Sequence, residues 1–318
     1  MNRHDLPDLH EIEVLAPATV ANLTVGFDCL GGALEGPLER LILTRSDLPG
    51  VRIRAIHGAD LPFEVERNVS GRAALSVLEK LGLADRCGLE LEIFKAVLPG
   101  SGIGSSAASA ASAAFGVNAL FEGQLSSADL LECALDGEYI ASGARHADNV
   151  APALFGGLCL VAGGEVDALP VPNWHLAVVH PQIEILTEAA RAALPATVPL
   201  QDALDQMAEF GRFISALHQG QDSKAASLLN DRLVEPCRIP LQPHFEAARD
   251  AANAAGSMGG GISGSGPSSF WVAPDAQTAR AIGSAVEQVF KQAGLACNQH
   301  ITKFSTRGAH VKSRSPRT

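Results

Sequence analysis

Long apolar runs are absent from this sequence, and so is the apolar core of an export signal. No uninterrupted stretch approaches the roughly 20 apolar residues that a membrane-spanning helix needs. The N-terminal stretch MNRHDLPDLHEIEV interleaves charged and apolar side chains, unlike a secretory signal peptide. We therefore expect a cytoplasmic protein that neither crosses a membrane nor is exported.

Positive charge and closely spaced cysteines are also lacking. The formal net charge is −11, which disfavours nucleic acid or an anionic membrane as the main partner. The six cysteines lie far apart, with no CxxC pair and no spacing typical of zinc ligands. Hydrophobic residues make up 47% of the 318, enough to fill the cores of one large or two ordinary domains. We expect a soluble protein with reduced thiols.

Both helices and strands are expected along the chain. Apolar alternation favours strands at 38–45, 51–56, 89–98, 175–180 and 268–273. Caps and composition favour helices at 68–82 (N-cap Asn68), 106–120, 127–142 (N-cap Ser127), 184–194, 201–219, 222–234, 243–255 and 275–294. Residues 163–175 resemble a loop between two halves, and 311–318 are expected to be disordered.

The most informative stretch is PGSGIGSSAAS, residues 99–109, which runs from a predicted strand into an alanine-rich helix. Unpaired N–H groups at a helix N-terminus attract anions, and glycines let the backbone approach a ligand closely. The stretch has no Lys-Ser or Lys-Thr pair, so it is not a Walker A motif. A helix cap in a tight turn would need one glycine rather than three, so we favour a phosphate-binding loop.

A second glycine pattern matches G-x-G-x-x-G at Gly259, Gly261 and Gly264. It follows a predicted helix and precedes a predicted strand, which is the reverse of the order in dinucleotide-binding folds. We therefore exclude a nicotinamide- or flavin-dependent dehydrogenase.

Three motifs in order resemble those of the GHMP kinases, the family of galactokinase, homoserine kinase and mevalonate kinase. PGSGIGSSAAS is similar to the family's P-x-x-x-G-[LI]-G-S-S-A, and APATVANLTVGFDCLGGAL and GGGISGSGPSSF resemble its first and third motifs. The resemblance implies an α+β, two-domain GHMP kinase fold. A ribosomal protein S5 domain 2-like N-terminal domain, which binds ATP, would span 1–165, and a ferredoxin-like C-terminal domain would span 166–318. The substrate site would lie at their interface.

Three further segments, HADNVAPALFGG, VVHPQIEILTEAARAALP and DRLVEPCRIPLQP, resemble the homoserine kinases of this family. They imply ATP-dependent phosphorylation of L-homoserine to O-phospho-L-homoserine in threonine biosynthesis, with ATP and Mg²⁺ as cofactors. A homodimer is common among such kinases. The first motif departs from the family pattern, because Thr24–Val25 replace the usual Gly-Pro with stiffer β-branched residues.

The resemblance also implies roles for particular residues. Those of the ATP-binding loop are Pro99, Gly100, Ser101, Gly102, Ile103, Gly104, Ser105 and Ser106. Ser106 and Glu138 would bind Mg²⁺, which prefers oxygen ligands and takes few of them from protein. Asp28 would bind the ammonium or hydroxyl group of homoserine. Arg191 and Arg238 would bind its carboxylate, unless Arg238 instead forms a surface ion pair with Asp231 or Glu235.

The candidates for catalysis are Asn149, Thr187 and Asp28, with Asn22 and Asn149 as further contacts to the substrate. Thr187 would meet the transferred phosphate. Asn149 stands where mevalonate kinases carry an aspartate that is usually taken as the catalytic base, and an amide cannot accept a proton at neutral pH. For His146, near Asp148, we favour a structural hydrogen bond.

The resemblance thus implies a hydroxyl that is positioned without a dedicated base, which the loose transition state of phosphoryl transfer tolerates. Three alternatives stay open. The chain could be another GHMP-type kinase acting on a different small alcohol, a non-catalytic GHMP-fold binding protein, or an ATP-consuming decarboxylase of the diphosphomevalonate type. The HADNVAP segment and the two arginines disfavour an isoprenoid substrate, and Ser106 with Glu138 disfavours a non-catalytic protein.

Overall fold

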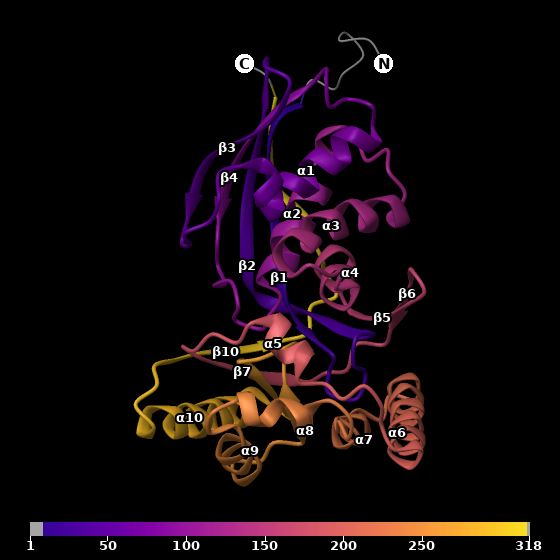
Figure 1. The fold of residues 1–318 in the computed structure, drawn as a ribbon, viewed down its shortest axis with the longest axis vertical. Coiled ribbons are helices and arrows are strands. Elements are labelled where there is room, and N and C mark those ends of the chain that lie inside the picture. Colours follow the sequence, from indigo (N-terminus) through magenta and orange to yellow (C-terminus); the bar gives the residue numbers. More distant parts are fainter. Residues whose placement is uncertain (1–8, 317–318) are drawn as a thin grey trace.

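The computed structural model describes residues 9–316, which form two units stacked end to end (Figure 1). The first unit is built on a seven-stranded sheet, of which five strands run in the order β11-β1-β2-β4-β3, while β5 pairs with β2 and with β6. These strands are β1 (Leu9–Ala21), β2 (Leu30–Ser46), β3 (Gly50–His57), β4 (Gly88–Phe94), β5 (Leu158–Ala162), β6 (Glu165–Leu169) and β11 (His310–Pro316). Only the β3–β4 pair is parallel.

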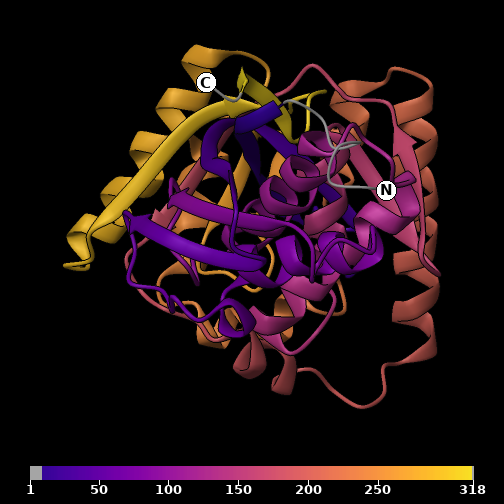
Figure 2. The same cartoon turned by 90° about the horizontal axis from the view of Figure 1, so that it is seen from above.

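Four helices lie on one side of this sheet, as Figures 1 and 2 show. They are α1 (Val69–Lys80), α2 (Ser105–Leu120), α3 (Ser127–Ser142) and α4 (Ala147–Phe155). The alanine-rich α2 packs against β1, β2 and all three other helices, so most of its side chains are buried. A Cβ added at Gly116 would lie 2.3 Å from a methyl carbon of Leu43. The small residues of α2 are therefore required by close packing on every side.

The second unit has a four-stranded antiparallel sheet in the order β10-β7-β9-β8. Its strands are β7 (His175–Pro181), β8 (Gly259–Ile262), β9 (Ser269–Ala273) and β10 (Cys297–Lys303). Its helices are α5 (Thr187–Ala192), α6 (Leu200–His218), α7 (Asp222–Ser227), α8 (Glu235–Arg238), α9 (Phe245–Ala254) and α10 (Ala276–Gln292). The long helix α6 lies along one edge of the molecule (Figures 1 and 2).

An apolar cluster joins the two units. Side chains of β1 and β2, among them Val20 and Leu34, share one buried core with Val178 of β7 and Phe270 of β9. Ile103 of the glycine loop belongs to the same core. The loop is thus anchored where the two units meet. Within residues 9–316, no helix combines the length and the apolar character needed to cross a bilayer.

The N-caps of two helices, α1 and α3, were predicted from the sequence. Asn68 caps α1 as predicted, its side chain accepting a hydrogen bond from the Gly71 N–H. The cap of α3 is Ser126, one residue before the predicted Ser127, and it accepts from the Asp129 N–H. Both side-chain oxygens satisfy an N–H group that has no partner within the helix.

Three sequence predictions were wrong, and one of them is the loop expected at 163–175, where Glu165–Leu169 form β6. The helix expected at 222–234 ends at Ser227, because the Asp231 carboxylate accepts hydrogen bonds from the N–H groups of Leu233, Val234 and Glu235 and so competes with helical bonding. The tail expected to be disordered, residues 311–318, forms β11 as far as Pro316, antiparallel to β1, and its last two residues lie outside the described residues. Its polar sequence suits an edge strand, and Lys312 and Ser313 both bond Glu13.

The predicted domain boundary, between residues 165 and 166, falls within strand β6. That strand belongs to the seven-stranded sheet, and so does β11 from the opposite end of the chain. We therefore propose that the first domain runs to Leu169 and also includes β11.

Candidate active site

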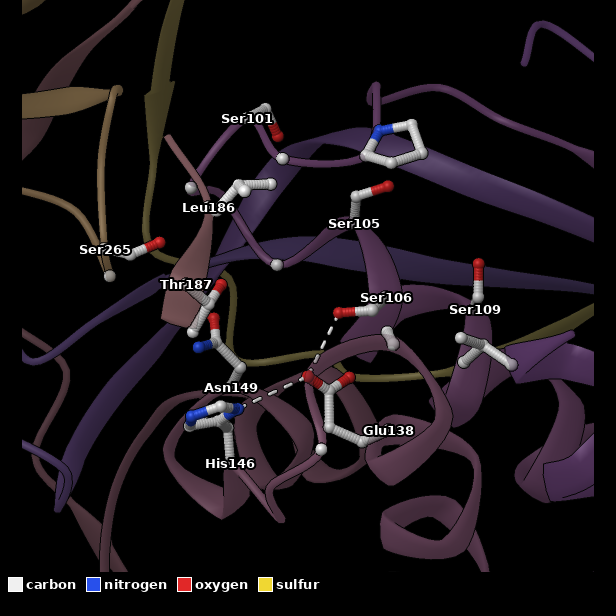
Figure 3. Close-up of a pocket in the computed structure, with 18 of the residues that line it drawn as sticks. Ser101, Ser105, Ser106, Ser109, Glu138, His146, Asn149, Leu186, Thr187 and Ser265 are labelled. Atoms are coloured by element: carbon white, nitrogen blue, oxygen red, sulfur yellow. Dashed lines mark hydrogen bonds and ion pairs between the residues drawn. The ribbon is translucent and has the colours of Figure 1, made fainter. Parts of the chain in front are cut away.

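A cavity of about 660 Å³ opens where the two units meet (Figure 3). Of the site residues predicted from the sequence, all but Ile103 line it. They come from the loop before α2, from α3 and α4, from the turn between β1 and β2, and from α5 and α8 of the second unit. The Ile103 side chain is buried in the core between the units, so only its backbone can face a ligand.

The glycine loop has the backbone that only glycine adopts readily. Gly100, Gly102 and Gly104 have φ of 73°, 80° and 67°, all in the left-handed region. A Cβ at Gly104 would lie 1.9 Å from the Thr19 hydroxyl oxygen, and one at Gly102 would lie 2.6 Å from the Gly266 carbonyl oxygen. No side chain caps α2. The N–H groups of its first turn are therefore available to an anion at the positive end of the helix dipole.

The hydroxyl groups around the loop have different environments. Ser105 donates to the Val97 carbonyl at 2.8 Å, so its side chain braces the loop and its contact with a ligand would be through the backbone. The Ser101 hydroxyl is buried and finds no hydrogen-bond partner among residues 9–316. Ser106 donates to Glu138 Oε1 at 3.1 Å.

The second glycine-rich segment supports the first. Ser263 donates to the Gly102 carbonyl at 2.7 Å, and the Ser268 N–H donates to the Ser101 carbonyl at 3.2 Å. Gly259 and Gly261 lie in β8, which pairs with β9 in the second sheet, and Gly264 lies in the turn between these strands. The G-x-G-x-x-G pattern therefore spans a strand and a turn that braces the loop, in keeping with the exclusion of a dinucleotide fingerprint.

Ser106, Glu138 and His146 point toward one another (Figure 3). His146 Nδ1 lies 3.7 Å from Glu138 Oε1, and this contact raises the pKa of the histidine while burial opposes the shift. The predicted structural role of His146 near Asp148 thus includes a contact with Glu138. A hydroxyl and a carboxylate beside a phosphate-binding loop suit Mg²⁺, which takes its other oxygens from phosphates and water. Among residues 9–316, no cluster of three or more His, Cys, Asp or Glu side chains could hold a metal by itself.

A second part of the cavity lining consists of a carboxylate and two guanidinium groups. Arg191 forms a two-pronged ion pair with Asp28, with N···O distances of 2.6 and 3.0 Å. Arg238 is buried and donates to the Gly264 carbonyl at 2.7 Å. Both guanidinium carbons lie about 5 Å from the centre of the Phe27 ring, at 5.1 Å for Arg191 and 5.0 Å for Arg238. Two guanidinium cations are therefore held close to one aromatic ring.

The alternative role for Arg238 as a surface ion-pair partner does not fit the structure. Glu235 pairs with Arg249, and the Asp231 carboxylate binds backbone N–H groups. Arg238 turns instead into the cavity, where its Nε has no hydrogen-bond partner among residues 9–316. Burial, and then the neighbouring Arg191, lower the pKa of Arg238.

The first-motif turn is wound in the left-handed region. Asn22, Leu23 and Thr24 have φ of 66°, 44° and 55°, and Asp28 has 58°. Thr24, which replaces the usual glycine, therefore adopts a conformation that is costly for a β-branched residue. Asn22 stabilises this turn, because its side chain accepts from the Asp28 N–H at 2.9 Å and donates to the Gly264 carbonyl at 3.1 Å.

Asn149 and Asp148 lie side by side at the start of α4. The amide oxygen of Asn149 accepts from the Thr19 hydroxyl at 2.7 Å. Asp148 is 4% exposed, and burial raises its pKa to about 7, an effect that the neighbouring His146 opposes. Thr187 begins α5, one turn before Arg191 on the same helix.

Sequence reasoning missed Lys95, Glu39 and Phe27. Lys95 and Glu39 form a buried ion pair at the base of the glycine loop, at 2.6 Å. These two residues come from different strands far apart in sequence, so no local pattern indicates the contact. Phe27 directly precedes Asp28 in the first motif, but nothing in the sequence of this turn predicts that two arginines contact its ring.

Comparison with known proteins places the chain in a family. The model of the GHMP kinases N terminal domain matches residues 68–157, and that of the GHMP kinases C terminal matches residues 200–292. A homoserine kinase of Xanthomonas campestris pv. campestris is 39% identical over 306 residues, which cover 95% of this chain and 94% of the relative. One of Xylella fastidiosa is 39% identical over 308 residues, covering 96% and 95%.

The crystal structure of homoserine kinase from Cytophaga hutchinsonii superposes on this chain with a TM-score of 0.90. Its sequence is 37% identical, and the match covers 98% of this chain and 99% of that one. The two family models and the homoserine kinase relatives together define a small-molecule kinase of the GHMP type. The chain belongs to the GHMP kinase family, in its homoserine kinase branch.

Proposed function

We propose that this protein transfers the γ-phosphoryl group of ATP to the hydroxyl of L-homoserine, giving ADP and O-phospho-L-homoserine, a step of threonine biosynthesis. The observation that carries the proposal is one cavity whose lining combines two chemically distinct groups of residues. The first, which we call the nucleotide end, is the glycine loop at the start of α2, and the second, which we call the acceptor end, is Asp28 with Arg191 and Arg238. The anion-binding loop suits a triphosphate, and the mixed-charge group suits an amino acid.

The nucleotide end is built from backbone donors rather than from a lysine that reaches into the phosphates. The three left-handed glycines, the uncapped first turn of α2 and the buried Ser101 hydroxyl would all face the phosphate chain. A cavity of about 660 Å³ is within the usual range for a small-molecule site.

Ser106 and Glu138 fit a Mg²⁺ ion bound with the nucleotide. Such an ion neutralises charge on the phosphate oxygens and holds them in one orientation. His146, in contact with Glu138, holds that carboxylate from the side away from the glycine loop.

The acceptor end is complementary to a zwitterion. Asp28 would bind the ammonium group, while Arg191 and Arg238 would bind the carboxylate. Binding would exchange the Asp28–Arg191 ion pair for ion pairs of both groups with the substrate, and Arg238 would share the substrate carboxylate with Arg191. The free Nε of Arg238 provides an additional donor.

Positioning, rather than a strong base, would carry the reaction. Asn149 and Thr187 would orient the acceptor hydroxyl and the phosphoryl group, and neither can take up a proton at neutral pH. A loose transition state gives the attacking hydroxyl little need of early deprotonation. Most of the rate would then come from alignment and charge neutralisation.

A coupled ADP-release assay tests this proposal. With Mg-ATP, homoserine should stimulate ADP release far above the rates seen with mevalonate, galactose or shikimate. ADP release that is independent of homoserine, or is greater with another alcohol, would refute the assignment of the substrate.

The proposed metal ligand can be tested with a matched pair of variants on one helix. Glu138→Gln should remove most of kcat at millimolar Mg²⁺, and part of the loss should be recovered at higher Mg²⁺. Glu132→Gln is the control, because Glu132 lies on the same α3 but is exposed and pairs with Arg145. Equal rates for the two variants would exclude Glu138 as a ligand.

A further inference from the structure

A buried ion pair lies at the base of the proposed phosphate loop, where Lys95 also contributes to the cavity lining. Lys95 follows the last residue of β4, and Glu39 is part of β2. Their charged atoms are 2.6 Å apart, and each side chain is only 2% exposed. Desolvation makes such a pair costly, so its presence calls for a role beyond general stability.

All three N–H bonds of the Lys95 ammonium have acceptors. Besides Glu39, it donates to the Ser105 carbonyl at 2.9 Å and to the Ser109 hydroxyl at 2.7 Å. Ser109 in turn donates to the other oxygen of Glu39. The group is therefore a closed network that links two strands to the first two turns of α2.

The network joins the two ends of the loop. Lys95 immediately precedes residues 96–104, and Ser105 immediately follows them, so the Lys95–Ser105 contact joins the two ends. The hydrogen bond from the Ser105 hydroxyl to the Val97 carbonyl is a second connection between the two ends of the loop. With both ends fixed, the three left-handed glycines and the first N–H groups of α2 keep one arrangement.

The position of the ammonium group is unfavourable for the helix alone. A cation near the N-terminus of a helix opposes the helix dipole, which favours negative charge there. Glu39 neutralises this cation, and a bound triphosphate would add further negative charge nearby. The arrangement is thus better suited to an anion-binding loop than to helix stability.

We propose that Lys95 and Glu39 are positioning residues, which hold the two ends of the loop ready for the phosphates, while the Lys95 ammonium keeps its three acceptors within the protein and does not bind the phosphates. The inference rests on the proposed nucleotide site, and it explains how the loop works without a P-loop lysine. A direct phosphate contact by Lys95 would require it to leave Glu39, Ser105 or Ser109.

Direct binding of Mg-ADP, measured by titration calorimetry in the absence of homoserine, tests this role. Lys95→Met should weaken Mg-ADP binding by about tenfold or more, because the loop must then be ordered on binding. The KM for homoserine should change by less than about twofold. Lys80→Met is the control, since Lys80 forms an exposed pair with Asp129 on the same unit, and it should leave Mg-ADP binding unchanged.

Glu39→Gln separates positioning from direct contact. If Lys95 positions the loop, loosening its partner should weaken Mg-ADP binding in the same direction as Lys95→Met. If Lys95 is itself a phosphate ligand, removing the competing carboxylate should strengthen Mg-ADP binding. Stronger binding by Glu39→Gln, or unchanged binding by Lys95→Met, would overturn the proposal.

A double variant separates positioning from folding. Lys95→Met/Glu39→Leu removes both buried charges, so its Tm should recover relative to Lys95→Met. Its Mg-ADP affinity should stay low, and recovery of affinity together with Tm would reduce the pair to a structural role and contradict the proposal. Wild-type protein that binds Mg-ADP but does not phosphorylate homoserine would refute the proposed substrate and leave this inference standing.

Discussion

Among single residues, most charged groups at the acceptor end of the cavity already have partners without substrate. Asp28 and Arg191 neutralise each other, Arg238 is held by the Gly264 carbonyl, and both arginines rest on Phe27. The site is therefore assembled in advance, and the substrate needs to exchange one ion pair rather than to gather distant groups. Such preorganisation lowers the entropy lost on binding.

Arg238→Lys should raise the KM for homoserine by roughly 10- to 100-fold. A lysine ammonium cannot hydrogen-bond the Gly264 carbonyl and a carboxylate together in the way that a guanidinium can. The KM for ATP should change by less than about twofold. Arg232→Lys is the matched control, because Arg232 is exposed and pairs with Glu209 away from the cavity. Equal changes in both KM values would place Arg238 outside the acceptor site.

Single residues also show what sequence can and cannot reveal. Asn68 was identified as a cap because capping depends on the next three residues alone. The Lys95–Glu39 pair was not, since its partners meet only after the sheet has formed. The roles of Asp28, Arg191 and Arg238 came from motif resemblance, and the ion pair between Asp28 and Arg191 had no sequence signal.

At the scale of elements, the glycine loop combines two different constraints on its residues. Gly100 and Gly104 both have a left-handed backbone. Around Gly100 the nearest atoms to an added Cβ belong to the Glu184 side chain, at 3.6 Å, whereas at Gly104 the Thr19 hydroxyl is 1.9 Å away. Conformation restricts both positions, but space restricts only the second.

Gly100→Ala and Gly104→Ala should consequently differ in effect. Both pay about 1–2 kcal/mol for a left-handed alanine. Gly104→Ala must also displace Thr19, which holds Asn149, so its kcat/KM for ATP should fall at least about tenfold further. Steady-state kinetics on both variants checks this, and similar losses would mean that the fit at Gly104 is unimportant.

Two histidines make the second sheet sensitive to acid. His180 on β7 and His300 on β10 are diagonal neighbours, and burial lowers the pKa of both, with His300 also lowering that of His180. Below a pH of about 6.5 the unfolded chain takes up protons more readily than the folded one, so the free energy of unfolding decreases as the pH falls.

The Tm should therefore fall between pH 7.5 and pH 5.5, and it should fall less in a His180→Asn/His300→Asn variant. Thermal unfolding followed by circular dichroism at the two pH values measures the difference. A drop of the same size in both proteins would show that other groups control the acid sensitivity.

Elements were predicted well where the local pattern decides and poorly where pairing decides. Helices α1, α2 and α10 lie where the sequence indicated, α1 from its Asn68 cap and α2 from its alanine-rich composition. Strand β11 was taken for a disordered tail, because its polar residues are stabilised only by β1. The expected helix at 222–234 ends early because Asp231 binds the backbone beyond it.

At the scale of the whole molecule, the last strand of the chain pairs with the first. It builds the first sheet, then the second, and comes back along β10 to add β11 beside β1. A shared apolar core and the contacts between the two glycine-rich segments fix the units against each other. The cavity between them can therefore hold a nucleotide and an amino acid in one alignment.

Phosphoryl transfer to homoserine can be followed directly by ³¹P NMR of a complete reaction with Mg-ATP and L-homoserine. If the proposed reaction takes place, one new phosphomonoester signal appears, identical to that of authentic O-phospho-L-homoserine and in one-to-one ratio with ADP. Inorganic phosphate as the sole product, or a phosphomonoester that forms without homoserine, would contradict it.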